Sequence, residues 1–545
     1  MLPAEPGSQK QTRFVDLLLV YLLALAVNGL VAILVNVPGY PDADYYFNGA
    51  LLVARGGPLV EPYFWNYAAA PAALPTPAFA YWQPLPSFIG ALGIWAFGSQ
   101  AAFGSAQAVF SLLGSAVPVL AYLVAAQLGE RRHALLSGVL AAFSGFYAIY
   151  WSLPESFTPF ALAGAGALLL AGIALRDGRA RLWLAAGACA GLAHLARADG
   201  LLLIAVLVPV ALSGAGRARG RLAHASLAVL GYLLVMAPWF ARNLVMFGSI
   251  QAPGGLRALW LVDYNDLFTY PNSLSASSFF AAGWEAILRS KWQALTTNTA
   301  TLIGALNLVI LTPFFFIGAW GLRRSTFLRP FFAYSVLLFI AMTFGFSLVG
   351  ARGGWMHSGS ALFPWIVAVG VVGFDRAILW AASRRPDWDP PRAFRMFGAL
   401  LVAVAAALTA YIVAGRVVGL PWRGVVAWNN SGSEFAEAGA YLDSLNLRRE
   451  LMVMTNNPMG FYARTGRGGI PLANGGEEAV LRAARDYGVY YLVIDQNIPE
   501  GLRALYERGA SSEAFILMKA FGDPANPTYL FFMPGDCNCN APPQG

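Results

Sequence analysis

Apolar runs long enough to cross a lipid bilayer recur through the first 415 residues of this chain, and they constrain its fold more than any other feature. A helix needs about 20 consecutive apolar residues to span the hydrocarbon core. Of the 545 residues, 58% are hydrophobic and only 12% are charged, whereas about a quarter of a soluble protein is charged. The sequence therefore predicts a mainly α-helical polytopic membrane protein.

Eleven runs have the length of a transmembrane helix. They are residues 14–37, 103–128, 134–153, 157–175, 182–197, 200–213, 222–240, 296–322, 330–349, 360–380 and 396–415. The first run is longer than the core of a signal peptide and no A-x-A site follows it, so we expect it to be retained. A further run, 84–98, is short and begins QPLPS, which favours a re-entrant or interfacial helix.

The distribution of basic residues sets the expected topology. If 84–98 does not span, 18 Lys and Arg residues fall on one side of the membrane and 7 on the other, before the C-terminal region. The positive-inside rule then places the N-terminus in the cytoplasm and the C-terminal region outside. The net charge of +8 is explained mainly by this topology, so nucleic-acid binding is not expected.

Residues 416–545 differ in character from the rest of the chain. We expect strands at 450–455, 489–495, 514–521 and 528–533 and helices at 477–488 and 499–509. Strands that alternate with helices are typical of an α/β domain. The sequence therefore predicts a transmembrane domain at 1–415, with an outer loop at 38–102 that carries juxtamembrane helices, and an extracytoplasmic α/β domain at 416–545 with a disordered tail.

Two acids lie close together in YPDADYY, where the first apolar run has ended. Asp42 follows a proline and precedes a stretch that ends at Gly56, which is the pattern of an N-cap, with Asp44 adding charge favourable to the helix dipole. Capping needs only one carboxylate. The alternative is that one of these acids is a general base at the membrane surface.

A third acid, Glu155, lies in the turn LPESF between two predicted spans. It is either a solvated turn residue or a second carboxylate over the same cavity as Asp42. In the second case we expect desolvation near the membrane to raise the pKa of Glu155, which suits a base.

Cations mark the predicted outer ends of several spans: Arg197, Arg242 and Arg352. They could pair locally, as Arg197 could with Asp199, or bind lipid headgroups. The sharper interpretation is that they surround a phosphate, since the guanidinium fork matches phosphate oxygens. His357 has a structural role or contacts substrate or a metal.

Aromatic residues are frequent in the first outer loop, including Tyr45, Tyr81 and Trp82. Aromatic side chains at a membrane boundary act as interface anchors, but sugar rings also stack on them. The sequence leaves both interpretations open.

An ordered set of motifs over roughly residues 14–365 resembles the GT-C fold integral-membrane glycosyltransferases. The resemblance is strongest to the family-39-like group of protein O-mannosyltransferases and aminoarabinose transferases of lipid A. The motifs are PDADYY, LLVARGG, YWQPLPSFIGALGIWAFG, LPESFTPF, GLAHLARADGLLLI and APWFARN.

The resemblance implies a polyprenyl-phosphate-linked sugar donor and a hydroxyl acceptor on a lipid, protein or polysaccharide, at the outer face of a bacterial plasma membrane. It implies that Asp42 or Asp44 is the base, with Glu155 as a second acid. The named arginines and His357 would bind the donor phosphate, and Tyr45, Tyr81 and Trp82 the substrate. Attack opposite the leaving phosphate would invert the anomer.

Metal dependence is left open by the sequence. Some members of the group bind zinc through a Glu just before the juxtamembrane proline, but this chain has Gln83, a poor zinc ligand. Three cysteines and four scattered histidines form no metal motif. We therefore expect no certain cofactor, although a divalent cation that bridges Asp44 or Glu155 to the phosphate is compatible with the sequence.

Two alternatives to a transferase are a lipid transporter or flippase and a non-catalytic scaffold. A transporter is expected to carry ionisable residues within its spans, or inverted repeats. Here the ionisable residues gather in loops and at span ends, and no repeat is evident.

Overall fold

A computed structural model describes residues 6–253, 255–385, 387–419 and 427–534. Its contacts divide the chain into two compact units. The first, called here the helical unit, comprises 1–36, 82–242 and 293–428; the second, the mixed unit, comprises 37–81, 243–292 and 429–545. The predicted disordered tail, with Cys537 and Cys539, lies outside the described residues.

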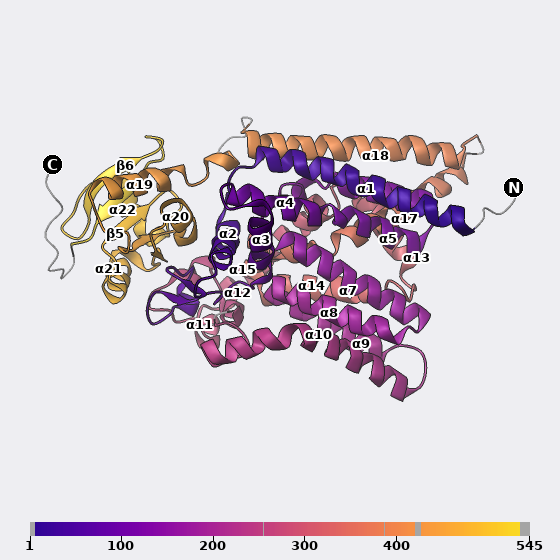
Figure 1. The fold of residues 1–545 in the computed structure, drawn as a ribbon, viewed down its shortest axis with the longest axis horizontal. Helices are drawn as coiled ribbons and strands as arrows, with labels where there is room; N and C mark the ends of the chain where they lie inside the picture. The colour runs from indigo at the N-terminus through magenta and orange to yellow at the C-terminus, as the bar shows by residue number, and fades with distance from the viewer. Residues whose placement is uncertain (1–5, 254, 386, 420–426, 535–545) are drawn as a thin grey trace. The chain divides into compact units, whose positions relative to one another are not determined.

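The helical unit is built from apolar helices of spanning length (Figure 1). Six helical stretches in the described residues are long and apolar enough to cross a membrane, or eight if each of two bent helix pairs is one span. The six are Arg13–Leu34, Ala102–Leu128, Phe157–Asp177, Ala218–Phe247, Phe363–Ala382 and Pro390–Val418. The prediction of a polytopic membrane protein is confirmed, whereas the predicted number of eleven spans stays a prediction.

The remaining helices of the helical unit are shorter or bent. Four short apolar helices are Leu85–Phe97 (α3), Ala180–Ala196 (α8), Ala198–Leu212 (η4 and α9) and Thr312–Leu322 (α13). The bent pairs join Arg131–Ala142 (α6) to Gly145–Ser152, and Arg329–Gly345 (α14 and η8) to Ser347–Gly359 (α15, η9 and α16). α12 spans Trp284–Thr301; its residues up to Trp292 belong to the mixed unit and the rest to the helical unit.

The predicted run 296–322 is interrupted. α12 ends at Thr301, a π-helical turn follows, and Leu308 and Val309 have positive φ before α13 begins at Thr312. Pro313 explains the new helix start, because a proline in the first turn has no amide to contribute and its φ already suits a helix.

The run 330–349 also departs from a straight span, because the chain bends by 108° before Ser347. The segment GARGG that follows contains Gly353 at φ 119°, a backbone conformation that residues other than glycine rarely adopt. This kink starts α16 (Trp355–Gly359), which carries His357.

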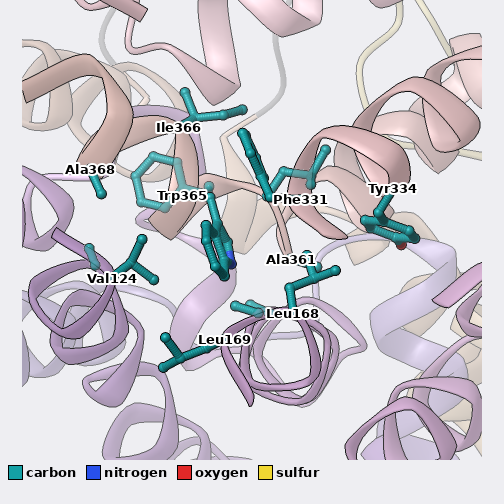
Figure 2. Packing of buried hydrophobic residues seen from close by; sticks show 14 of the residues in the cluster. Val124, Leu168, Leu169, Phe331, Tyr334, Ala361, Trp365, Ile366 and Ala368 are labelled. Carbon is teal, nitrogen blue, oxygen red and sulfur yellow. The ribbon is translucent and has the colours of Figure 1, made fainter. Parts of the chain in front are cut away.

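The core of the helical unit brings α5 (Ala116–Leu128), α7 (Phe157–Asp177), α14 (Arg329–Ile340) and α17 (Phe363–Ala382) together (Figure 2). Trp365 stacks on Phe331 with ring centroids 5.4 Å apart. Small residues allow α7 to approach the segment before α17 closely. A Cβ added to Gly164 of α7 would lie only 2.6 Å from the Cβ of Ala361. This packing fixes the start of α7, next to Glu155.

The C-terminal part of the mixed unit is an α/β domain around a five-stranded sheet. The strand order is β4 (Gly469–Pro471), β3 (Val453–Thr455), β5 (Tyr491–Ile494), β7 (Thr528–Phe532), β6 (Ile516–Phe521), with β4, β3 and β5 parallel and β7 antiparallel to both neighbours. All four predicted strands are confirmed, and the short β4 is additional.

Helices cover both faces of this sheet (Figure 1). α19 (Ser433–Ser444) and α20 (Pro458–Thr465) pack on one face. α21 (Gly476–Tyr487) and α22 (Arg503–Arg508) pack on the other, where the sequence predicted helices.

The rest of the mixed unit comes from two distant segments. Residues 37–81 supply α2 (Pro41–Ala54), which packs on α20, and the hairpin of β1 (Val60–Glu61) and β2 (Thr76–Pro77). Residues 243–292 supply η5 (Gly255–Trp260), η6 (Tyr264–Phe268) and α11 (Ala276–Ala281). Side-chain contacts join them to the α/β domain, as when Tyr67 Oη donates to the Pro471 carbonyl at 2.7 Å. The predicted domain boundary at 415/416 stays a prediction. The contacts divide the chain differently, because residues 37–81 and 243–292 belong to the same unit as residues 429–545.

Candidate functional site

The acids of YPDADYY lie in the first turn of α2. Pro41 occupies the first helical position, and the N-cap is Tyr40, whose side chain makes no capping hydrogen bond. The interpretation of Asp42 as the N-cap is therefore wrong, because the fixed φ of proline starts the helix two residues earlier. Asp42, which is partly buried, and Asp44 both lie where the helix dipole favours negative charge.

Asp44 is the more buried acid, with 4% of its surface exposed. Its Oδ2 accepts a hydrogen bond from Asn457 Nδ2 at 3.3 Å, while Oδ1 has no hydrogen-bond partner among the described residues. Burial raises the pKa of Asp44 to about 6, against the opposing effects of the Arg464 charge and the Asn457 hydrogen bond. A carboxylate with such a pKa is suited to accept a proton near neutral pH.

Several partners of α2 were missed from the sequence. Asn48 Nδ2 donates to the Met459 carbonyl at 3.0 Å, and the buried Glu61 accepts from the Phe79 amide at 3.2 Å. Asn457 caps α20 by accepting from the Gly460 amide. A sequence signal did exist for two partners of Asp44: Asn457 and Arg464 belong to the polar run TNNPMGFYARTGR directly after a predicted strand.

Tyr45 and Tyr81 line one small cavity in the mixed unit, of about 30 Å³, beside Trp65 and Glu61. The rings of Trp65 and Tyr81 are 4.8 Å apart. This volume holds about one water molecule and no sugar ring. Trp82 belongs to the helical unit. The substrate-binding role of these three residues stays a prediction.

A second group of polar residues lies in the helical unit, around Glu155. The Glu155 side chain is fully buried in the turn before α7. One carboxylate oxygen accepts from the Phe157 amide at 2.8 Å. The other accepts from Ser156 Oγ at 2.9 Å and lies 3.2 Å from His357 Nδ1. The His357 ring stacks on Phe157 at 4.0 Å, which fixes its orientation.

Arg197 extends this network. Its Nη1 donates to Ser156 Oγ at 3.3 Å, and its Nε pairs with Asp199 Oδ1 at 3.1 Å. Asp199 in turn accepts a hydrogen bond from Ser358 Oγ. The local ion pair with Asp199 therefore exists, and it is part of a larger network that brings three predicted residues together: Glu155, Arg197 and His357.

The pKa of Glu155 departs from the expectation. Burial alone would raise this pKa, but the His357 imidazole, the Arg197 charge and the Phe157 amide together hold it below its ordinary value. The expectation of a raised pKa at Glu155 is therefore wrong, because the sequence did not reveal that His357 and Arg197 lie beside this carboxylate.

The other two predicted arginines, Arg242 and Arg352, also belong to the helical unit. Arg242 is on α10 (Ala218–Phe247), with its guanidinium carbon 4.8 Å from the ring centroid of Trp239. Arg352 is in the kinked segment before α16, and its side chain is exposed. Their phosphate-binding role stays a prediction.

No cofactor is established for this chain. Glu155 and His357 offer an oxygen and a nitrogen ligand close together. An oxygen and a nitrogen ligand of this kind are compatible with a bound divalent cation.

A polytopic helical unit with a C-terminal α/β domain is the architecture of GT-C membrane proteins, and the comparisons confirm this fold. Residues 82–241 match the family model described as dolichyl-phosphate-mannose-protein mannosyltransferase. No curated protein sequence matches the chain.

Two solved structures carry the fold comparison. The archaeal oligosaccharyltransferase AglB from Archaeoglobus fulgidus, in complex with an inhibitory peptide and a dolichol-phosphate, matches with TM-score 0.58 and 16% identity, over 96% of this chain and 74% of AglB. ArnT from Cupriavidus metallidurans in the apo state matches with TM-score 0.54 and 14% identity, over 96% of this chain and 98% of ArnT.

These matches confirm the resemblance drawn from the sequence motifs. The matched family and the two structures are of glycosyltransferases, and they give no support to the flippase alternative. A further structure of the Archaeoglobus fulgidus oligosaccharyltransferase, with TM-score 0.55, 14% identity and coverage of 93% of this chain and 72% of its own, contains Zn and sulfate.

Proposed function

We propose that this chain is a membrane glycosyltransferase that moves a sugar from a polyprenyl-phosphate carrier to a hydroxyl acceptor. One observation carries the proposal: the segment that matches the mannosyltransferase family, 82–241, contains Glu155 and Arg197, two members of the buried network with His357. A buried network of charges is expensive to maintain unless it is well paired or serves a function.

The reaction needs a base and a stabilised leaving group. The acceptor hydroxyl attacks the anomeric carbon while Asp42 or Asp44 takes its proton. The bond between that carbon and the phosphate oxygen breaks, and the lipid phosphate leaves with the electron pair. The attack comes from the face opposite the phosphate, so the anomer is inverted. The raised pKa of Asp44 supports it as the base, and the partial exposure of Asp42 supports the alternative.

Cations stabilise the departing phosphate in this mechanism. Arg197, Arg242 and Arg352 are the proposed partners of its oxygens. Glu155 acts as a positioning residue that holds His357 at Nδ1. Charge–charge stabilisation of this kind requires no metal, since the leaving group is already an anion.

Turnover by the purified full-length chain tests the proposal. Polyprenyl-phosphate mannose and polyprenyl-phosphate aminoarabinose, radiolabelled in the sugar, are supplied with lipid, protein and polysaccharide acceptors. We expect a new glycosidic bond and release of polyprenyl phosphate, with a loss of about 100-fold or more in the variant that lacks the base, Asp42→Asn or Asp44→Asn. Asp263→Asn is the matched control, because Asp263 is an exposed acid of the same unit.

Transport of the labelled lipid without glycosidic bond formation would overturn the transferase. Full activity of both Asp42→Asn and Asp44→Asn would remove these acids from the mechanism and leave the transferase in place.

We propose a plasma-membrane location with the N-terminus in the cytoplasm and the mixed unit outside. The support is the excess of basic residues in the loops assigned to the cytoplasm. Single cysteines introduced at Ser444 and at Ser383, labelled with a membrane-impermeant maleimide in intact cells, test it. Labelling at Ser444→Cys alone is expected, and labelling at Ser383→Cys alone would invert the topology.

A divalent cation that bridges Asp44 or Glu155 to the donor phosphate is the finer proposal for the cofactor. Turnover is measured after EDTA treatment and again after Mg²⁺, Mn²⁺ or Zn²⁺ is added back. Loss and recovery of turnover support the bridging ion, whereas full activity in EDTA contradicts it.

A further inference from the structure

A second, larger cavity lies within the mixed unit and shares Glu61 with the Tyr45 and Tyr81 cavity. Its volume is about 500 Å³, within the range of small-molecule sites. Its walls come from α2, from the hairpin strand β1 with the residues after it, from α19 and from α20. Two parts of the chain that are distant in sequence, residues 48–63 and 436–466, thus form one concave surface.

The charges around this cavity favour an anion. Arg55, Arg449 and Arg464 line it, against the acids Glu61 and Asp443. Asp443 is already engaged, at 2.6 Å from the buried Arg467 and at 3.6 Å from Arg449. The Arg449 side chain is 73% exposed, so its guanidinium can reorient toward a ligand. Guanidinium groups bind phosphate through paired hydrogen bonds.

Uncharged side chains in the same wall favour a ligand that carries hydroxyl groups and a ring. Asn48 is 4% exposed, and its Oδ1 has no hydrogen-bond donor among the residues that the structure describes. A buried acceptor of this kind is costly unless a ligand or water supplies a proton. The rings of Tyr63 and Tyr462, 5.2 Å apart, provide an aromatic wall.

We propose that this cavity binds a saccharide that carries a phosphate group. The arginines would hold the phosphate, Asn48 and Glu61 would accept hydrogen bonds from sugar hydroxyls, and the tyrosine rings would pack against the sugar. The proposal concerns binding by the mixed unit and does not depend on the transferase mechanism.

Isothermal titration calorimetry on the full-length chain in detergent tests the proposal, with mannose 6-phosphate, mannose and inorganic phosphate as probes. We expect saturable binding of mannose 6-phosphate, and binding of mannose and of phosphate weaker by about tenfold or more, because each lacks one set of partners. Equal affinity for mannose 6-phosphate and inorganic phosphate would mean an unspecific anion patch and would overturn the proposal. Absence of saturable binding would also overturn it.

Variants localise the binding. Arg55 and Arg449 are both exposed in the wild-type protein. The variants Arg55→Gln and Arg449→Gln are each expected to weaken mannose 6-phosphate binding by about tenfold. Ala440→Trp, which fills the cavity from α19, is expected to abolish it. Arg485→Gln on α21, outside the cavity lining, is the matched control and should bind like the wild type. Unchanged binding in all three cavity variants, with unfolding temperatures like the wild type, would place the ligand elsewhere. Turnover of polyprenyl-phosphate sugar is assayed separately, so failure of this site leaves the proposed reaction standing.

Discussion

Asp44 of the mixed unit and Glu155 of the helical unit are both buried carboxylates, yet their acidities move in opposite directions. Burial raises the pKa of Asp44 to about 6, against one hydrogen bond from Asn457 at 3.3 Å and the charge of Arg464. Glu155 has a histidine, an arginine, a hydroxyl and an amide around it, and its pKa falls below the ordinary value. Burial is common to both, so the partners decide the direction.

This difference separates two kinds of role. A carboxylate that is fully satisfied when ionised holds its neighbours in place and resists protonation. A carboxylate with too few hydrogen-bond donors and cations around its ionised form readily takes a proton. Pairs of acids whose surroundings push their pKa values apart are a common basis of acid–base chemistry in enzymes. This difference supports the proposal that the first turn of α2 transfers the proton and that the turn before α7 positions its neighbours.

The largest expected effect comes from Glu155→Gln. The substitution leaves His357 and Arg197 beside a neutral amide in a buried site, so we expect a loss of about 3 kcal/mol in stability. Thermal unfolding in detergent measures it, with Glu155→Asp as the control that keeps the charge and loses less. Because the folded pKa of Glu155 lies below its unfolded value, its stabilisation is present above the unfolded pKa and is lost as the pH falls through the folded pKa. An unchanged unfolding temperature at pH 7.5 would refute the role of the ionised network.

Asp44→Asn is expected to raise the stability of the protein, whereas Glu155→Gln lowers it. At pH 7.5 the wild-type protein buries an ionised Asp44, and we expect the amide to raise stability by about 1–3 kcal/mol. The folded pKa lies above the ordinary 3.8, so the wild-type stability falls as the pH rises from about 4 to 6. The advantage of Asp44→Asn should therefore shrink as the unfolding measurement moves from pH 7.5 to pH 4.5. An advantage that does not vary with pH would show that Asp44 is not the titrating group.

A smaller effect is expected from Arg464→Gln. The Arg464 charge lowers the pKa of Asp44, so its removal should raise that pKa above 6 by up to about one unit. The acidic limb of the turnover–pH profile should move to higher pH by the same amount if Asp44 is the base. Arg482→Gln, an exposed arginine on α21, is the control and should leave the limb in place.

The smallest stability effect is expected from Arg242→Gln. Its cation–π contact with Trp239 is worth about 0.5–1 kcal/mol. Unfolding temperature and turnover are compared in the same preparation. A turnover loss of tenfold or more without a matching loss of stability would support phosphate binding, and parallel small losses would leave Arg242 as a packing residue.

The sequence predicted the membrane-spanning character, the four strands and the identity of the acids, because these follow from local pattern and composition. It could not predict the acidities. Asn457, the hydrogen-bond partner of Asp44, lies 413 residues away in the chain, and His357 lies about 200 residues from Glu155. Partner identity over such distances is a property of tertiary packing, so the raised pKa assigned to Glu155 was wrong.

The sequence-based prediction of local structure was wrong where a single residue overrides the pattern around it. The N-cap assignment at Asp42 overlooked that Pro41 could itself open the helix. The run 296–322 is apolar throughout, but Pro313 restarts the helix after a break. The strand β4 has three residues, too few to show alternation.

The interleaved make-up of the mixed unit has a consequence for biosynthesis. α2 emerges early, but its partner Asn457 and the carbonyl of Met459 are made about 400 residues later. At a synthesis rate of about 5–20 residues per second, the first outer loop waits roughly 20–80 s for the chain that completes it. During that interval Tyr45, Tyr63 and Tyr67, all buried in the finished protein, lack their final covering. A ribosome that stalls, or a stop codon before residue 429, would leave this loop permanently without its partner, a species that quality-control proteases recognise.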